Sequence, residues 1–192
     1  TPLSEHDAPA PLNVYGATKL MGENLARKHH KNTIICRVAS LFGVRGASGK
    51  GGNFIETMLR VAKEKGELNV VNDQTMSPTS TWDLADMLLK LLQSGETKGV
   101  YHAVNSGQAS WYDFALEIIK QSGLNVPVNP VPTSAMPTAS SRPVYSVMDN
   151  TKLNQRIGPI RTWKEALRDY LQVRSPAPAI ASDATQSPGK VS

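Results

Sequence analysis

Residues 13–39, with the sequence NVYGATKLMGENLARKHHKNTIICRVA, contain a helix pattern followed directly by a strand pattern. Asn13 stands at the N-cap position of a helix predicted over residues 13–31. One face of this helix carries apolar side chains at helical spacing, at Val14, Ala17, Met21 and Leu25. Residues 33–39 are nearly all apolar, which is typical of a strand buried on both faces of a parallel sheet.

The alternation of helix and strand patterns continues toward the C-terminus. Further helices are predicted over residues 54–65, 82–93, 111–122 and 163–172. Two short apolar runs predict strands at residues 68–71 and 100–104. The polar residues 72–81 predict a loop, and residues 125–148 predict loops with short strands. Helix ends are indicated by Gly66 and Gly123, and capping boxes by the pairs Ser80–Asp83, Ser110–Asp113 and Thr162–Glu165.

This order of elements predicts an α/β protein with parallel strands. Only two to four strands are visible, fewer than a free-standing doubly wound sheet needs, so the chain reads as part of a longer one. We expect residues 1–122 to be a partial Rossmann-like region, with the helix of residues 13–31, interleaved with a small α/β lobe. Residues 123–174 are expected to complete that lobe and end in the final helix. Residues 175–192, rich in Pro, Ala and Ser, are expected to be a disordered tail.

Composition narrows the cellular setting. Hydrophobic residues make up 40% and charged residues 19% of the 192 residues. No apolar run approaches the roughly 18 residues that a membrane span needs, and the N-terminus has no signal-peptide pattern. The lone Cys36 lies in an apolar run and is interpreted as a small buried side chain in a reducing compartment. We therefore expect a cytoplasmic protein without a membrane partner.

The charged residues and histidines do not predict a nucleic-acid or metal partner. The net charge is +5, but the basic residues are scattered. The densest cluster, residues 27–31, falls at a predicted helix end, where positive charge suits the helix dipole. The four histidines show no metal-ligand spacing with Cys36 or acidic residues. A mild positive charge would also attract an anionic substrate such as a nucleotide diphosphate.

Tyr15 and Lys19 form the main candidate catalytic pair. They are four residues apart on the first predicted helix and therefore share a face. A lysine beside a tyrosine favours the phenolate, and such a phenol exchanges a proton with a carbonyl or hydroxyl group near neutral pH. Taken alone, the spacing also fits an ordinary pair on a helix surface.

The residues around this pair add a resemblance to a known family. Residues 11–23, PLNVYGATKLMGE, resemble the active-site helix of extended short-chain dehydrogenases, which have a Rossmann domain and a smaller substrate lobe. The resemblance narrows to the dTDP-4-dehydrorhamnose reductase family through segments spread in collinear order over residues 1–172. They include GNF at 52–54, VVNDQ at 70–74, SPT at 77–79, GVYH at 99–102, SWYDFA at 110–115 and PTASSRP at 137–143.

The resemblance implies a reaction and roles for the pair. It implies that the chain is the C-terminal portion of an oxidoreductase that reduces dTDP-4-dehydro-L-rhamnose to dTDP-L-rhamnose with NADPH, or alternatively NADH. Tyr15 would protonate the C4 oxygen as the hydride arrives, and Lys19 would bind the nicotinamide ribose and tune Tyr15. The isolated chain is expected to be inactive, because no Gly-rich turn of the kind that cradles the cofactor pyrophosphate is found.

Four further residues are candidates for contacts with the dTDP-sugar. Arg142 has a guanidinium suited to diphosphate oxygens, although a surface or interdomain salt bridge is an alternative. Asn53 either caps the helix that follows it or contacts the sugar nucleotide. Asp73 and Gln74 either line the nucleotide pocket or shape a turn. Ser40 stands where family members often carry Trp, so sugar contacts are expected to differ there.

Alternative functions stay open on this information. A related nucleotide-sugar epimerase or dehydratase would use Tyr15 and Lys19 as well. A non-catalytic regulatory subunit of the same superfamily, similar to that of methionine adenosyltransferase, would need neither residue. A homodimer is a further expectation.

Overall fold

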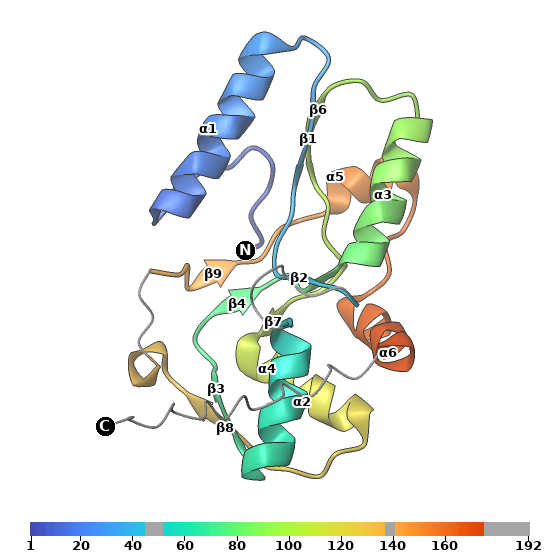
Figure 1. The fold of residues 1–192 in the computed structure, drawn as a ribbon. Helices are drawn as coiled ribbons and strands as arrows, with labels where there is room; N and C mark the ends of the chain where they lie inside the picture. The colour runs from blue at the N-terminus through green and yellow to red at the C-terminus, as the bar shows by residue number, and fades with distance from the viewer. Residues whose placement is uncertain (45–51, 137–140, 175–192) are drawn as a thin grey trace, which may run out of the picture.

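A computed structural model describes residues 1–44, 52–136 and 141–174 (Figure 1). Its elements are α1 (Val14–His29), β1 (Ile34–Arg37), β2 (Leu41–Phe42), α2 (Phe54–Lys65), β3 (Leu68–Val71), β4 (Thr75–Met76), β5 (Thr79–Ser80), α3 (Thr81–Gln93), β6 (Gly99–His102), β7 (Ala109–Ser110), α4 (Trp111–Ser122), β8 (Val128–Val131), η1 (Thr133–Ala135), β9 (Tyr145–Ser146), α5 (Thr151–Ile157) and α6 (Trp163–Val173). The predicted α/β class is confirmed. The predicted tail over residues 175–192 lies outside the described residues, and the predicted domain boundaries stay a prediction.

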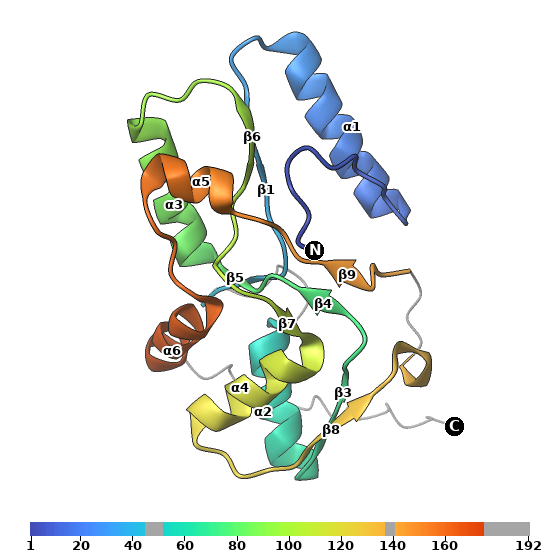
Figure 2. The ribbon, with the colours of Figure 1, turned by 180° about the vertical axis from the view of Figure 1, so that it is seen from behind.

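The upper part of the molecule is built on one pair of parallel strands, β1 and β6. α1 lies on one side of this pair, and α3 and α5 lie on the other (Figures 1 and 2). Among the described residues β1 pairs with β6 alone, so its other edge is open. All four residues of β1 are half-buried, so the prediction of burial on both faces is wrong for this chain.

The helix α1 begins as predicted, with the Asn13 side chain accepting a hydrogen bond of 2.9 Å from the Gly16 N–H. None of its sixteen residues is buried. The predicted apolar face points to solvent, with Val14 80%, Met21 56% and Leu25 50% exposed. An apolar helix face of this kind normally packs on another element.

The lower part of the molecule has a dense core. β3 pairs in parallel with β8, and α2 and α4 cover them. Aromatic rings from three helices meet beside them: Phe54 stacks on Phe114 with centroids 5.6 Å apart, and Phe114 meets the edge of Trp163 at 5.5 Å. Gly66 and Gly123 end α2 and α4 in the left-handed conformation, as predicted.

The capping predictions hold at two helices and fail in part at a third. Both the α4 and α6 capping boxes form, through Ser110–Asp113 and Thr162–Glu165. Ser80 caps α3, but the Asp83 carboxylate does not return to the Ser80 backbone. It binds the Arg161 side chain instead, with Arg161 Nη2 2.7 Å from its Oδ1.

Short strands join the two parts, and they correct the prediction of a polar loop over residues 72–81. β4 pairs with β7 and β9, and β5 pairs with β2. Met76, Ser77 and Thr79 are buried because this segment crosses the interior. The short helix α5 was not predicted. The N-terminal segment pairs with the stretch that follows β9, since Leu3 forms a parallel bridge with Met148.

Candidate functional site

Tyr15 and Lys19 lie on the first two turns of α1, as the spacing predicted. Lys19 Nζ is 5.3 Å from the centroid of the Tyr15 ring, within the range of a cation–π contact. Tyr15 is 71% exposed, so its hydroxyl is open to a docking molecule. The structure thus brings the two candidate catalytic groups together on an accessible helix face.

The N-terminus of α1 is tied to the segment that carries Arg142. Asn13 Nδ2 donates a hydrogen bond of 2.9 Å to the Ser141 carbonyl, across 128 positions of sequence. Arg142 itself is exposed. This contact brings the backbone next to Arg142 to the turn just before Tyr15.

Asn53 acts as the N-cap of α2, one of the two roles left open by the sequence. Its Oδ1 accepts from the Glu56 N–H at 3.1 Å, and its Nδ2 donates to the Gly43 carbonyl at 2.8 Å and to the Tyr170 hydroxyl at 2.9 Å. Both amide hydrogens are therefore used. A direct contact between Asn53 and substrate stays a prediction, and it would require exchange of one of these bonds.

Asp73 and Gln74 meet at the side chain of Thr133. The Asp73 carboxylate accepts hydrogen bonds from the Thr133 N–H at 2.9 Å and from its hydroxyl at 2.5 Å, and these bonds lower the pKa of Asp73. The Gln74 side chain is buried, and its Nε2 donates to Thr133 Oγ1 at 2.9 Å. The two residues thus attach the turn after β3 to the start of η1. Their contact with a nucleotide stays a prediction.

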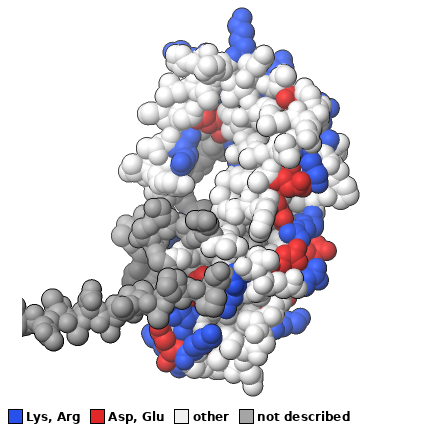
Figure 3. Space-filling view, turned by 45° about the vertical axis from the view of Figure 1, so that its right-hand side comes forward, with Lys and Arg blue, Asp and Glu red and all other residues white. Residues whose placement is uncertain are grey.

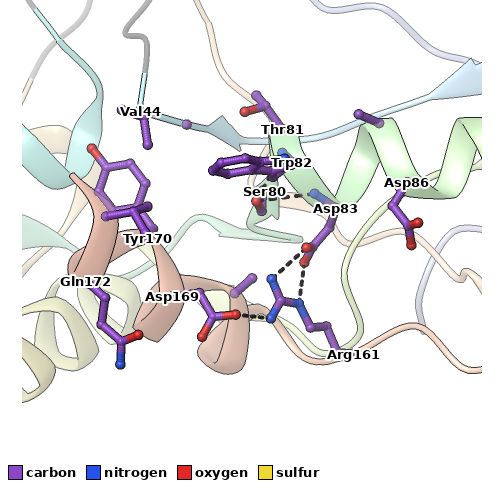
Figure 4. Close-up of a pocket in the computed structure, with 14 residues that line it drawn as sticks. Val44, Ser80, Thr81, Trp82, Asp83, Asp86, Arg161, Asp169, Tyr170 and Gln172 are labelled. Atoms are coloured by element: carbon purple, nitrogen blue, oxygen red, sulfur yellow. Dashed lines mark hydrogen bonds and ion pairs between the residues drawn. The ribbon is translucent and has the colours of Figure 1, made fainter. Parts of the chain in front are cut away.

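A pocket of about 1090 Å³ lies elsewhere, between the end of β2, the start of α3 and α6 (Figure 4). It contains none of the predicted site residues. Arg161 forms one wall, held between the carboxylates of Asp83 and Asp169, which raise its pKa. Trp82, 68% exposed at the start of α3, was not singled out from the sequence. Because α3 lies across β1 and β6 from α1, this pocket is separate from the Tyr15–Lys19 site.

His102 is a buried titratable group at the carboxyl end of β6. Its backbone N–H donates to Glu5 Oε1 at 2.9 Å, and its Nδ1 lies 3.1 Å from the Asp149 carbonyl. Burial lowers the pKa of His102 from 6.5, the main effect, although the carboxylate of Glu5 opposes it. In the residues that the structure describes, no group of three or more His, Cys, Asp or Glu side chains is arranged to hold a metal ion. No helix among them is both long and apolar enough for a membrane crossing.

Charged side chains of both signs are mixed on the visible surface. Figure 3 shows a largely uncharged face, on which Lys and Arg side chains lie beside Asp and Glu side chains along one edge. Close ion pairs among the described residues include Lys90–Asp86 at 2.7 Å. In the coloured part of Figure 3 the basic side chains do not form a continuous stripe of the kind that tracks a nucleic-acid backbone.

Comparison with known proteins decides the family. The model of the RmlD substrate binding domain family matches residues 1–175. The chain belongs to this family. The prediction made from the active-site helix and the collinear segments is therefore confirmed.

This chain is similar to a curated polysaccharide biosynthesis protein and to curated dTDP-4-dehydrorhamnose reductases. It is 42% identical over 176 residues to the spore coat polysaccharide biosynthesis protein SpsK of Bacillus subtilis. This match covers 92% of this chain and 60% of that protein. It is 40% identical over 164 residues to the dTDP-4-dehydrorhamnose reductase of Escherichia coli K12, covering 80% of this chain and 53% of the enzyme. The chain thus spans between half and two thirds of the length of these relatives.

Solved structures of the same family share the fold. A dTDP-4-dehydrorhamnose reductase from Clostridium acetobutylicum matches with a TM-score of 0.80 and 39% identity, over 90% of this chain and 59% of that one. The Bacillus anthracis enzyme, solved in complex with NADP, matches with a TM-score of 0.81 and 36% identity, over 88% of this chain and 58% of that one. The predicted Rossmann-like α/β class is confirmed by this agreement.

Proposed function

We propose that this chain supplies the proton donor and the sugar-nucleotide contacts of an NADPH-dependent dTDP-4-dehydrorhamnose reductase. The observation that carries the proposal is the family match over residues 1–175, in which Tyr15 and Lys19 lie together and exposed on α1. Relatives named for this activity are 35–41% identical. The reaction converts dTDP-4-dehydro-L-rhamnose to dTDP-L-rhamnose.

Tyr15 acts as the general acid in this proposal. Reduction of the C4 ketone places negative charge on its oxygen, and the Tyr15 hydroxyl donates the proton that neutralises it. The residues present fit a nicotinamide cofactor, because the exposed Lys19 ammonium beside Tyr15 can donate to ribose hydroxyls. NADPH, when bound, supplies the hydride. The ammonium also stabilises the phenolate that Tyr15 becomes.

Arg142 binds the diphosphate of the dTDP-sugar in this proposal. Its planar guanidinium matches phosphate oxygens, and the Asn13–Ser141 hydrogen bond holds its segment beside the start of α1. Asn53, Asp73 and Gln74 are proposed to shape the rest of the sugar-nucleotide site. Their observed hydrogen bonds fix the start of α2 and the turn after β3.

A second copy of the same protein is the proposed partner, and the cytoplasm the proposed location. The helix α3 supports an interface between copies, because it exposes Trp82, Leu89 and Leu92, at 68%, 55% and 64%. Light scattering on the purified protein decides the point. A mass of one chain at micromolar concentration would contradict the dimer.

Turnover tests the catalytic assignment. We would replace the matching 164 residues of the Escherichia coli enzyme by this chain and follow NADPH oxidation with dTDP-4-dehydro-L-rhamnose. Tyr15→Phe is expected to reduce kcat by a factor of about 10² to 10⁴, because general acid catalysis contributes that much. Tyr145→Phe, a tyrosine on β9, is the matched control and should retain turnover. Full activity of Tyr15→Phe would overturn the proposal.

Binding by the isolated chain provides a second test. Calorimetric titration with NADPH and then with dTDP is expected to show no NADPH binding, with weak dTDP binding at most. Arg142→Ala should abolish any dTDP signal while leaving the circular dichroism spectrum unchanged. Tight NADPH binding by the chain alone would contradict our view that the cofactor pyrophosphate is bound by another part of the enzyme.

A further inference from the structure

The helix α1 touches the rest of the molecule along one narrow stripe. The positions that are partly buried, Gly16, Leu20, Glu23 and Ala26, follow one another at intervals of three or four residues and so share one face. Apolar packing alone therefore fixes the helix weakly, because no side chain of α1 is fully buried. Among the described residues, polar contacts along this stripe hold α1 against β1.

A two-pronged ion pair joins Glu23 on the stripe to Arg37, and Glu23 also pairs with Arg27 on its own helix at 2.7 Å. Arg37 Nη2 is 2.7 Å from Glu23 Oε1, and Arg37 Nε is 3.0 Å from Glu23 Oε2. The two side chains are only 11% and 18% exposed. Paired bonds between a planar guanidinium and a carboxylate fix direction as well as distance. The hydrogen bonds from Arg37 also lower the pKa of Glu23, so the carboxylate stays charged at neutral pH.

This ion pair joins the helix that carries the candidate catalytic pair to the carboxyl end of β1. Glu23 is one helical turn beyond Lys19 and two beyond Tyr15, about 6 and 12 Å along the axis. Arg37 is the last residue of β1. In parallel α/β sheets, ligands bind beyond the carboxyl ends of the strands. The pair thus links the helix that carries Tyr15 to the strand end where substrate is expected.

We propose that Glu23, clamped by Arg37, is a positioning residue that fixes the rotation and depth of α1 and so places the Tyr15 hydroxyl and Lys19 ammonium against the ketone. This inference rests on the proposed function. Glu23 touches no reacting atom and acts through the helix. A displacement of about 1 Å at a reacting group costs on the order of 10²-fold in rate, so a small rotation of α1 is enough to slow turnover.

Hydrogen exchange on the chain itself tests the clamp without any activity. Glu23→Gln keeps the shape of the side chain but removes the charge. Amides of α1 are expected to exchange at least about threefold faster than in the unmodified chain, while amides of α4 keep their rates. The matched control is Glu64→Gln, since Arg60–Glu64 has the same 2.7 Å distance but is 56% and 53% exposed. Equal exchange of α1 in Glu23→Gln and in the unmodified chain would overturn the proposal.

Kinetics in the Escherichia coli chimaera separate positioning from a loss of folded protein. Glu23→Gln is expected to lower kcat about tenfold with less than a twofold change in KM for the sugar nucleotide. The deuterium isotope effect on kcat, with NADPH deuterated at the transferred position, should rise because hydride transfer becomes slower than product release. A smaller amount of folded enzyme would lower kcat without raising this isotope effect, and that result would contradict the proposal.

Two more variants identify the source of any failure. Arg37→Lys keeps the charge but loses the planar fork, so its kcat is expected between that of Glu23→Gln and the unmodified chimaera. If Tyr15→Phe is inactive while Glu23→Gln and Arg37→Lys keep full kcat, the positioning role alone is wrong. If Tyr15→Phe is fully active, the proposed function itself is wrong.

Discussion

The region around α1 and the region around α2, α4 and α6 differ in how they are held together. The first has a capped helix with no buried residue and a strand with an open edge. The second buries Phe114, Ile118 and Leu167 to within 1% of full burial. Both regions carry apolar faces at helical spacing. Among the described residues, only the second region has partners on which such a face packs.

The largest expected effect is in the dense region. Phe114→Ala removes a ring that contacts Phe42, Phe54 and Trp163, so it should lower the free energy of unfolding by about 3–5 kcal/mol. Met21→Ala, on the exposed face of α1, should change it by less than about 0.5 kcal/mol. Urea unfolding followed by tryptophan fluorescence measures both. A loss of similar size in the two variants would show that α1 is packed as tightly as α4.

What the sequence could predict also divides between these regions. Local signals predicted the ends of α2 and α4 correctly, because a capping side chain or a glycine such as Gly66 acts within a few residues. The segment 72–81 was predicted to be a loop because many of its residues are polar. In the structure, parts of it pair with β2, β7 and β9, which come from distant parts of the sequence and could not be seen in the local pattern. Ser80 and Asp83 had capping-box spacing, but Arg161, 78 positions away, takes the carboxylate.

The candidate site follows the same rule. The Tyr15–Lys19 pair could be predicted because both residues lie on one helix, where spacing determines proximity. The contact between Asn13 and Ser141 and the clamp between Glu23 and Arg37 could not, since they depend on how separate elements pack. Asn53 was assigned two roles because an N-cap and a ligand contact need the same side chain, and only the structure shows its partners.

A smaller effect compares the helix caps of the two regions. Ser110→Ala removes the capping box of α4 and should lower the global free energy of unfolding by about 1 kcal/mol. Asn13→Ala removes the cap of α1 and the bond to Ser141, yet should leave global unfolding nearly unchanged, because α1 adds little buried surface. Its effect should be local, as faster hydrogen exchange over the first turn of α1. An equal global loss from both caps would contradict the division into two regions.

The smallest expected effect is a pH dependence of the free energy of unfolding that is caused by His102, the last residue of β6. Burial lowers the pKa of His102 in the folded chain below 6.5, so the unfolded state binds more protons as the pH falls through that value. Stability from the neutral ring is present above about pH 6.5 and is lost as pH falls toward the lower folded pKa. Glu5, Asp149, Glu23 and Arg37 surround this end of β6, and the lowered pKa values of Glu23 and Asp149 act only at more acidic pH.

Thermal unfolding at pH 7.5 and pH 5.5 isolates this contribution. The unmodified chain is expected to have a lower Tm at pH 5.5 than at pH 7.5, because the unfolded state binds more protons at the lower pH. His102→Gln keeps a buried hydrogen-bonding side chain but cannot titrate, so its Tm should fall less over the same interval. His6→Gln is the exposed control and should behave like the unmodified chain. If His102→Gln and the unmodified chain lose the same number of degrees, the buried ring is not the group that titrates, and the acid sensitivity must come from exposed groups shared by both.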